Sequence, residues 1–225
     1  MKLFDKSLDL ADRIQMGISM VIRAVLVVAI IQGAATGNWA VVFVSLLALV
    51  LTIVPLLWAG RYNVKLPIDF ELAIVLFIYA AIFLGTVRGY YQRFWWWDAF
   101  LHTGSGFALG FIGFLILYLL YAQKKLQASP FLMAFFAWAF ALALGAAWEI
   151  FEYSIDGLFG TNMQRSGLPD TMADLIVDAL GALFASGIGY IYLKQNIWDP
   201  FDGAIRKFLA TNPRFKGKAS RRGSA

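Results

Sequence analysis

The sequence predicts an all-α integral membrane protein with six transmembrane helices arranged as a bundle. Of its 225 residues, 60% are hydrophobic, and the mean hydropathy of +0.69 is unusually high. A soluble domain usually contains about 45–50% apolar residues, so a water-soluble globular fold is excluded. Six stretches reach the ~20 mostly apolar residues that a membrane-spanning helix needs. Together they leave no room for a separate soluble domain.

The six predicted spans follow one another closely and define a transmembrane domain over residues 1–193. They are Ile14–Gly33, Trp39–Ala59, Ile68–Val87, Asp98–Tyr121, Phe131–Tyr153 and Thr171–Leu193. Charged residues precede the first span, and no small-residue cleavage pattern follows it. We therefore expect this helix to stay in the membrane rather than to be removed as a signal peptide.

The distribution of Lys and Arg predicts the orientation of these spans. With six spans both termini share one side of the membrane, and fifteen of the 19 Lys and Arg residues fall on that side. The opposite side holds only Arg88, Arg93 and Arg165, and the remaining Arg23 lies within the first span. Because basic residues accumulate in cytoplasmic connections, we expect both termini to be cytoplasmic. Arg23 is expected to extend toward the cytoplasmic face.

Residues 194–225 form a basic tail. Its apolar residues recur at helical spacing, which predicts a short amphipathic helix lying in the membrane interface. These residues are Trp198, Phe201, Ile205, Phe208 and Leu209. The chain from Thr211 onward is rich in Lys, Arg, Gly and Ser and is expected to be disordered. Most of the net charge of +5 lies in this tail, so we expect it to contact anionic membrane lipids rather than nucleic acid.

The most informative residues are acidic. Seven of the 14 carboxylates, with the single histidine, lie at one end of the last three spans. They are Asp98 with His102, then Glu149, Glu152 and Asp156, then Asp170, Asp174 and Asp178. Spacings of three or four residues place each group on one face of its helix. Carboxylates beside or inside hydrocarbon are costly, so the cluster predicts a functional site at the outer face.

So many like charges cannot all ionise side by side unless cations or protons are bound. Oxygen ligands with one imidazole favour Mg, Mn, Ca or Fe(II) over zinc. The expected ligands are Asp98, His102, Glu149, Glu152, Asp174 and Asp178. The alternative is a hydrogen-bonded polar core that only fixes helix packing. Because Asp98 lies one helical turn from His102 on the same face, we favour a role for this histidine in metal or proton binding over a role in helix packing.

The longest outer connection is predicted over Ser154–Asp170. It contains Gln164 and Arg165 and ends at Asp170. We expect these three residues to bind a substrate. The connection could be a lid whose Arg165 pairs with an anionic group, or a plain solvated loop. The fourth and sixth spans also look weakly alike, as if a helix pair had been duplicated.

Three segments together resemble the signature of the YjdF-like family of bacterial inner-membrane proteins. They are Trp97–His102, Trp148–Glu152 and Asp170–Asp174, the last continuing to Asp178 and Gly181. The resemblance runs from the first span to Leu193. The pattern is also distantly similar to that of VanZ-like proteins, which have Gln and Asn where this chain has Glu152 and Asp178. The resemblance implies a helical inner-membrane fold and a site at these residues, but no reaction.

Two main functions fit these observations. The first is a metal-dependent enzyme acting on a lipid-linked or anionic substrate at the outer headgroup level, where a cation could activate water or neutralise phosphate. The second is a cation- or proton-coupled transporter that uses the carboxylates as a relay. An envelope scaffold without chemistry is the third alternative. No nucleophile or general base can be named from the sequence.

Overall fold

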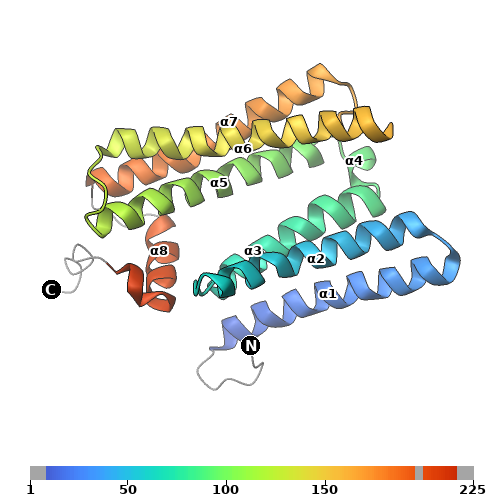
Figure 1. The fold of residues 1–225 in the computed structure, drawn as a ribbon, viewed down its shortest axis with the longest axis horizontal. Helices are drawn as coiled ribbons and strands as arrows, with labels where there is room; N and C mark the ends of the chain where they lie inside the picture. The colour runs from blue at the N-terminus through green and yellow to red at the C-terminus, as the bar shows by residue number, and fades with distance from the viewer. Residues whose placement is uncertain (1–8, 196–199, 217–225) are drawn as a thin grey trace. The chain divides into compact units, whose positions relative to one another are not determined.

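A computed structural model describes residues 9–195 and 200–216, and every regular element within these residues is a helix (Figure 1). In chain order the helices are α1 Leu10–Thr36, α2 Trp39–Arg61, α3 Ile68–Ile78, the π-helix η1 Tyr79–Val87, α4 Tyr90–Arg93, α5 Trp97–Ala122, α6 Pro130–Phe159, α7 Leu168–Gln195, α8 Pro200–Thr211 and the 3-10 turn η2 Pro213–Phe215. Six helical segments, α3 and η1 counting as one, are long and apolar enough to cross a membrane. The expected all-α fold is confirmed, and so is the presence of six helical segments with the length and composition of membrane spans.

The third helical segment matches its predicted span, Ile68–Val87, and the other five extend beyond theirs. The largest shift of a single helix end is in α6, which continues to Phe159 instead of ending at Tyr153. It stops where Gly160 adopts the left-handed conformation that commonly ends a helix (φ 63°). Since α7 begins at Leu168, the connection predicted over Ser154–Asp170 is wrong in length. Only residues 160–167 lie outside the two helices.

The chain divides into two compact units, Met1–Trp97 and Asp98–Ala225, which we call unit 1 and unit 2. In unit 1 the buried residues of α1 recur every three or four positions and so form one face. They are Met16, Ser19, Ile22, Leu26, Ala29 and Gly33. Leu26 and Ala29 pack with Ala48 of α2 and Phe83 of η1 in the core of this unit.

Unit 1 also contains a partly buried ion pair. The Arg23 guanidinium donates from Nη1 to Glu71 Oε1 at 3.0 Å, and from Nη2 to the Thr52 carbonyl oxygen at 3.1 Å. The Arg23 side chain is only 21% exposed. No local pattern in the sequence indicates this pairing, and the expectation that Arg23 extends toward the cytoplasmic face stays a prediction. A carboxylate on α3 satisfies the guanidinium inside the helix packing.

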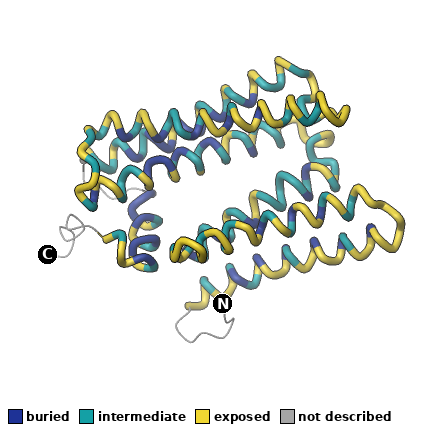
Figure 2. The backbone as a smooth tube through the Cα atoms, in the orientation of Figure 1, coloured by how far each residue is buried: buried dark blue, intermediate teal, exposed yellow. Residues whose placement is uncertain are grey.

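In unit 2, α5, α6 and α7 lie side by side, with α6 antiparallel to α5 and α7 antiparallel to α6 (Figure 1). Small residues on these helices are fully buried, among them Ala137, Ala182 and Ala185. Large apolar residues instead cover the outward faces, where exposed positions predominate (Figure 2). Phe131 is 69% exposed and Phe184 is 68% exposed. Such continuous exposed apolar surface is typical of helices that face lipid.

Helix α8 runs across the direction of α5 and α7 (Figure 1). Its apolar residues Phe201, Ile205, Phe208 and Leu209 are buried. The Phe201 ring packs on Phe111 of α5 with centroids 4.6 Å apart. The helical part of the tail is therefore an amphipathic helix that packs on protein, and its position in the headgroup layer stays a prediction. Trp198 and most of the basic end lie outside the described residues.

Candidate functional site

Close contact between α5 and α7 brings the predicted site residues together. A Cβ atom at Gly106 would overlap the backbone of Asp178, and one at Gly181 would overlap the carbonyl of Thr103. The two glycines therefore allow the helix backbones to approach from both sides. This crossing lies within one turn of His102 on α5 and beside Asp178 on α7.

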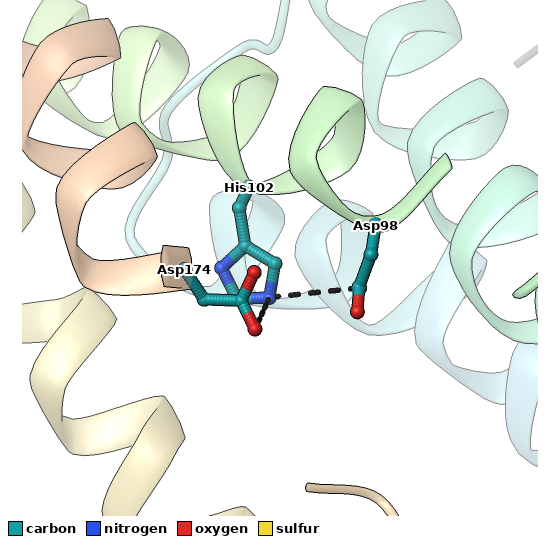
Figure 3. Close-up of side chains that lie close together, drawn as sticks. All are labelled: Asp98, His102 and Asp174. Atoms are coloured by element: carbon teal, nitrogen blue, oxygen red, sulfur yellow. Dashed lines mark ion pairs between the residues drawn. The ribbon is translucent and has the colours of Figure 1, made fainter. Parts of the chain in front are cut away.

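Three residues form a compact group at this crossing (Figure 3). His102 Nε2 lies 3.9 Å from Asp98 Oδ1 and 3.9 Å from Asp174 Oδ2. One potential ligand atom from each of the three side chains lies within 4.8 Å of the other two. The side chains are 18%, 11% and 7% exposed for Asp98, His102 and Asp174. The group could hold a cation between two carboxylates and one imidazole.

Asp178 approaches the same imidazole from its other nitrogen. Its Oδ2 lies 3.4 Å from His102 Nδ1, and its Oδ1 accepts a hydrogen bond of 3.3 Å from the Ser105 hydroxyl. A Cβ atom at Gly145 of α6 would overlap this carboxylate, so glycine at that position makes the space for it. Asp178, which belongs to α7, is thus also enclosed by α5 and α6.

Glu149 lies one turn beyond Gly145 on the same face of α6. The residue is 3% exposed, and neither carboxylate oxygen has a hydrogen-bond partner among the described residues. The polar side chains of Thr171 and Gln164 lie near it, and its charge interacts with those of His102 and Asp178. A buried carboxylate without a partner is costly. Its position beside the Asp98–His102–Asp174 group marks it as a further carboxylate available to a cation.

Glu152, the other glutamate predicted as a ligand, is less enclosed. Its Oε1 accepts a hydrogen bond of 3.0 Å from the Trp148 indole one turn earlier. Trp148 itself is 47% exposed on the outward face of α6. Glu152 still interacts electrostatically with Glu149, His102 and Asp98. It therefore lies at the edge of the cluster rather than in the compact group.

The connection between α6 and α7 is organised by Asp156. This carboxylate accepts hydrogen bonds from the Thr161 hydroxyl at 2.6 Å and from the backbone N–H groups of Met163 and Gln164 at 2.8 and 2.9 Å. The sequence grouped Asp156 with the acidic cluster without a specific role. The structure shows it holding the turn that presents Gln164 and Arg165.

The three residues assigned to substrate binding lie around the compact group. Arg165 donates from Nη2 to Asp98 Oδ2 at 2.5 Å. Gln164 donates to the Thr171 hydroxyl at 2.6 Å and to the Glu149 carbonyl oxygen at 3.4 Å. Asp170 is half-buried in the first turn of α7 and interacts electrostatically with Asp98 and Asp174.

Three residues of this site were not identified as functional from the sequence, namely Ser105, Thr171 and Gly145. Ser105 and Thr171 are single hydroxyl residues, which carry no pattern of their own. Ser105 is three residues after His102, on the same helix face, so its position could have been noted. Gly145 lies beside the Asp178 carboxylate only because of how α6 and α7 meet, which no local pattern shows.

The sequence matches a family of predicted membrane proteins, designated DUF2238, over residues 14–195. The chain belongs to this family. The membership is consistent with the YjdF-like resemblance, whereas the relation to VanZ-like proteins stays a prediction. An uncharacterized protein of Thermotoga maritima is 31% identical over 137 residues, which cover 56% of this chain and 66% of that protein, just under two thirds of its length. No solved structure matches the chain.

Proposed function

We propose that the protein binds a divalent cation through Asp98, His102 and Asp174, with Glu149 as a further ligand. The observation that supports this most directly is the buried Glu149 carboxylate, which makes no hydrogen bond of good geometry among the described residues, although the polar side chains of Thr171 and Gln164 lie near it. A cation would supply the missing partner and balance the surrounding carboxylates. Mg, Mn, Ca and Fe(II) suit a set of oxygen ligands with a single imidazole.

The distances within the group agree with this proposal. Ligands about 2.1 Å from a metal are about 3 Å apart when adjacent and about 4.2 Å apart when opposite. The two separations of 3.9 Å around His102 Nε2 lie within that range. Small rotations of the Asp98 and Asp174 side chains would close the shell. The shared helix faces at the α5–α7 crossing keep the three residues near this arrangement.

A cation here would suit an anionic ligand. Arg165 already lies against Asp98, so a guanidinium and a metal ion would flank the same carboxylate. Together they could bind a phosphate or a carboxylate, with Gln164 and Asp170 at the rim. We propose a metal-dependent enzyme that acts on a lipid-linked or anionic substrate, the cation activating water or neutralising the substrate.

Proton-coupled transport is the second candidate. His102 lies within 3.9 Å of three carboxylates, one of them at its other ring nitrogen. The same arrangement could hold a proton in place of a metal ion and pass it between carboxylates. The two functions differ in one respect that is easily measured. Only the metal site binds and responds to divalent cations.

Direct measurement of bound cation tests the proposal. The detergent-purified protein should retain Mn²⁺ or Fe²⁺ close to one equivalent by elemental analysis, and titration with Mn²⁺ should show one saturable site. His102→Ala and Asp174→Asn should each lose this binding. Glu71→Gln removes a carboxylate from unit 1 and should bind cation as the native protein does. A native protein that binds no divalent cation would overturn the metal site.

We further propose that the protein lies in the bacterial inner membrane as a six-helix bundle, with both termini cytoplasmic and the site at the outer face. The Lys and Arg distribution supports this orientation. The chain contains no cysteine, so single cysteines can be introduced at the exposed positions Gln127 and Ser166. Their labelling is then measured on intact cells, where an impermeant reagent reaches only the outer side. Ser166 should react with an impermeant reagent and Gln127 should be protected. The reverse pattern would place the site on the cytoplasmic side.

A further inference from the structure

We infer that Asp178 is a positioning residue, which holds the His102 ring so that Nε2 faces the cation. This inference rests on the proposed function and assigns different roles to the carboxylates of that site. Asp98 and Asp174 both approach Nε2 at 3.9 Å. Asp178 approaches Nδ1, on the opposite side of the ring, at 3.4 Å. The imidazole therefore lies between Asp178 at Nδ1 and the two carboxylates of Asp98 and Asp174 at Nε2.

The surroundings of Asp178 suit an orienting group better than a ligand. Its side chain is only 3% exposed, and each of its oxygens faces a different neighbour. Oδ2 faces His102 Nδ1 at 3.4 Å, and Oδ1 accepts from the Ser105 hydroxyl at 3.3 Å. The absence of a side chain at Gly145 makes the space for the carboxylate. Asp178 is thus held against the ring from three sides.

The chemistry of imidazole turns this geometry into a division of roles. A neutral imidazole that coordinates a metal through one nitrogen carries its proton on the other. Ligating histidines commonly donate that second N–H to a carboxylate, which fixes the ring and its tautomer. In this site Nδ1 donates to Asp178, and the Nε2 lone pair points to the space between Asp98 and Asp174. Asp178 thus acts on the cation only through His102.

Nitrogen NMR of the imidazole tests the assignment, because the chain contains one histidine. Protein labelled with ¹⁵N at the ring, and purified through a tag without histidine, gives the signals of His102 alone. Spectra are recorded without cation and with Zn²⁺ as a diamagnetic probe, and Mn²⁺ affinity is measured in parallel. The variants are Asp178→Ala, Ser105→Ala and Asp174→Asn, with Asp12→Ala, in unit 1, as the control.

We expect Zn²⁺ to shift the Nε2 resonance and to leave the proton on Nδ1. Asp178→Ala should remove the hydrogen-bonded Nδ1–H signal and weaken Mn²⁺ binding 10- to 100-fold, the usual loss for an outer-shell partner. Asp174→Asn should weaken binding further and leave the Nδ1–H signal in place. Ser105→Ala should shift that signal without abolishing it, and provides the same test if Asp178→Ala does not fold.

Three results would overturn the inference. These are a Zn²⁺ shift on Nδ1, an Nδ1–H signal that neither Asp178→Ala nor Ser105→Ala alters, and loss of Mn²⁺ binding in Asp178→Ala as complete as in Asp174→Asn. Failure of the proposed function is a different result, namely a native protein whose spectrum no divalent cation changes. In that case the cation-free spectra of native protein and Asp178→Ala still decide whether Asp178 holds the ring.

Discussion

Both units bury charged side chains within candidate membrane spans, but they balance the charge differently. In unit 1, Arg23 and Glu71 form an ion pair of 3.0 Å, and Thr52 supplies further acceptors to the guanidinium. In unit 2, one histidine lies among several carboxylates, and Arg165 pairs with Asp98 at the rim. Glu149 has no hydrogen-bond partner among the described residues.

The difference separates a charge that supports the fold from charges that are available for function. An ion pair whose remaining donors are also hydrogen-bonded balances its own charge, so neither partner needs a bound cation or proton. An excess of buried carboxylates is costly unless a cation or protons are bound. The stability of unit 1 should therefore fall when one partner of its ion pair is removed. The stability of unit 2 should rise when a cation is added.

Breaking the ion pair of unit 1 should have the largest effect on stability. Arg23→Met leaves Glu71 buried without a partner and should lower the free energy of unfolding by about 3 kcal/mol. The double variant Arg23→Met/Glu71→Met should recover most of this loss, because no unpaired charge remains. Equilibrium unfolding in mixed micelles measures both. If the single and double variants lose stability equally, the two side chains are not energetically coupled.

Addition of a cation should have the next largest effect, and it should act through unit 2. At a hundredfold excess over Kd, Mn²⁺ should stabilise the native protein by about 2.7 kcal/mol, and a chelator should remove this gain. Asp174→Asn should abolish the response and, without cation, should be no less stable than the native protein, since it removes one of the repelling charges. Thermal unfolding with and without Mn²⁺ tests this.

Glu71→Gln is the matched control, because it removes a carboxylate from unit 1. It should lower stability and keep the response to Mn²⁺. A cation response that survives Asp174→Asn but disappears in Glu71→Gln would reverse the roles assigned to the two units.

Filling the space beside Asp178 should have a moderate effect. A methyl group at Gly145 overlaps the Asp178 carboxylate, and overpacking of this kind costs about 1–3 kcal/mol. Gly145→Ala should therefore lower stability and weaken Mn²⁺ binding together. Gly187→Ala on α7 is the control, since a Cβ atom there has no neighbour within 4 Å. Equal behaviour of the two variants would show that the contact between Gly145 and Asp178 is unimportant.

The smallest effect is expected at the rim of unit 2. Arg165 is 32% exposed where it meets Asp98, and partly solvated ion pairs contribute about 0–1 kcal/mol. Arg165→Gln should thus change stability by less than about 1 kcal/mol, in contrast to Arg23→Met. A loss as large as that of Arg23→Met would show that this pair also supports the fold.

The sequence by itself determined the membrane class, the six candidate spans and the helices that carry the acidic cluster. These properties depend on local composition and on the helical period, which places residues such as Asp98 and His102 on one face regardless of what that face meets. The same period predicted an amphipathic helix near Phe201 and Leu209.

Only the tertiary structure decided which charges meet. Glu71 and Arg23 are 48 positions apart in the chain, and no local pattern indicates that they pair. Likewise, the spacing of Asp174 and Asp178 on α7 makes them look equivalent. Their difference arises because α5 crosses α7 at Gly106 and Gly181, which sets one carboxylate against each nitrogen of His102. Helical periodicity orients a side chain around its own axis, whereas its partner depends on how closely two backbones can approach.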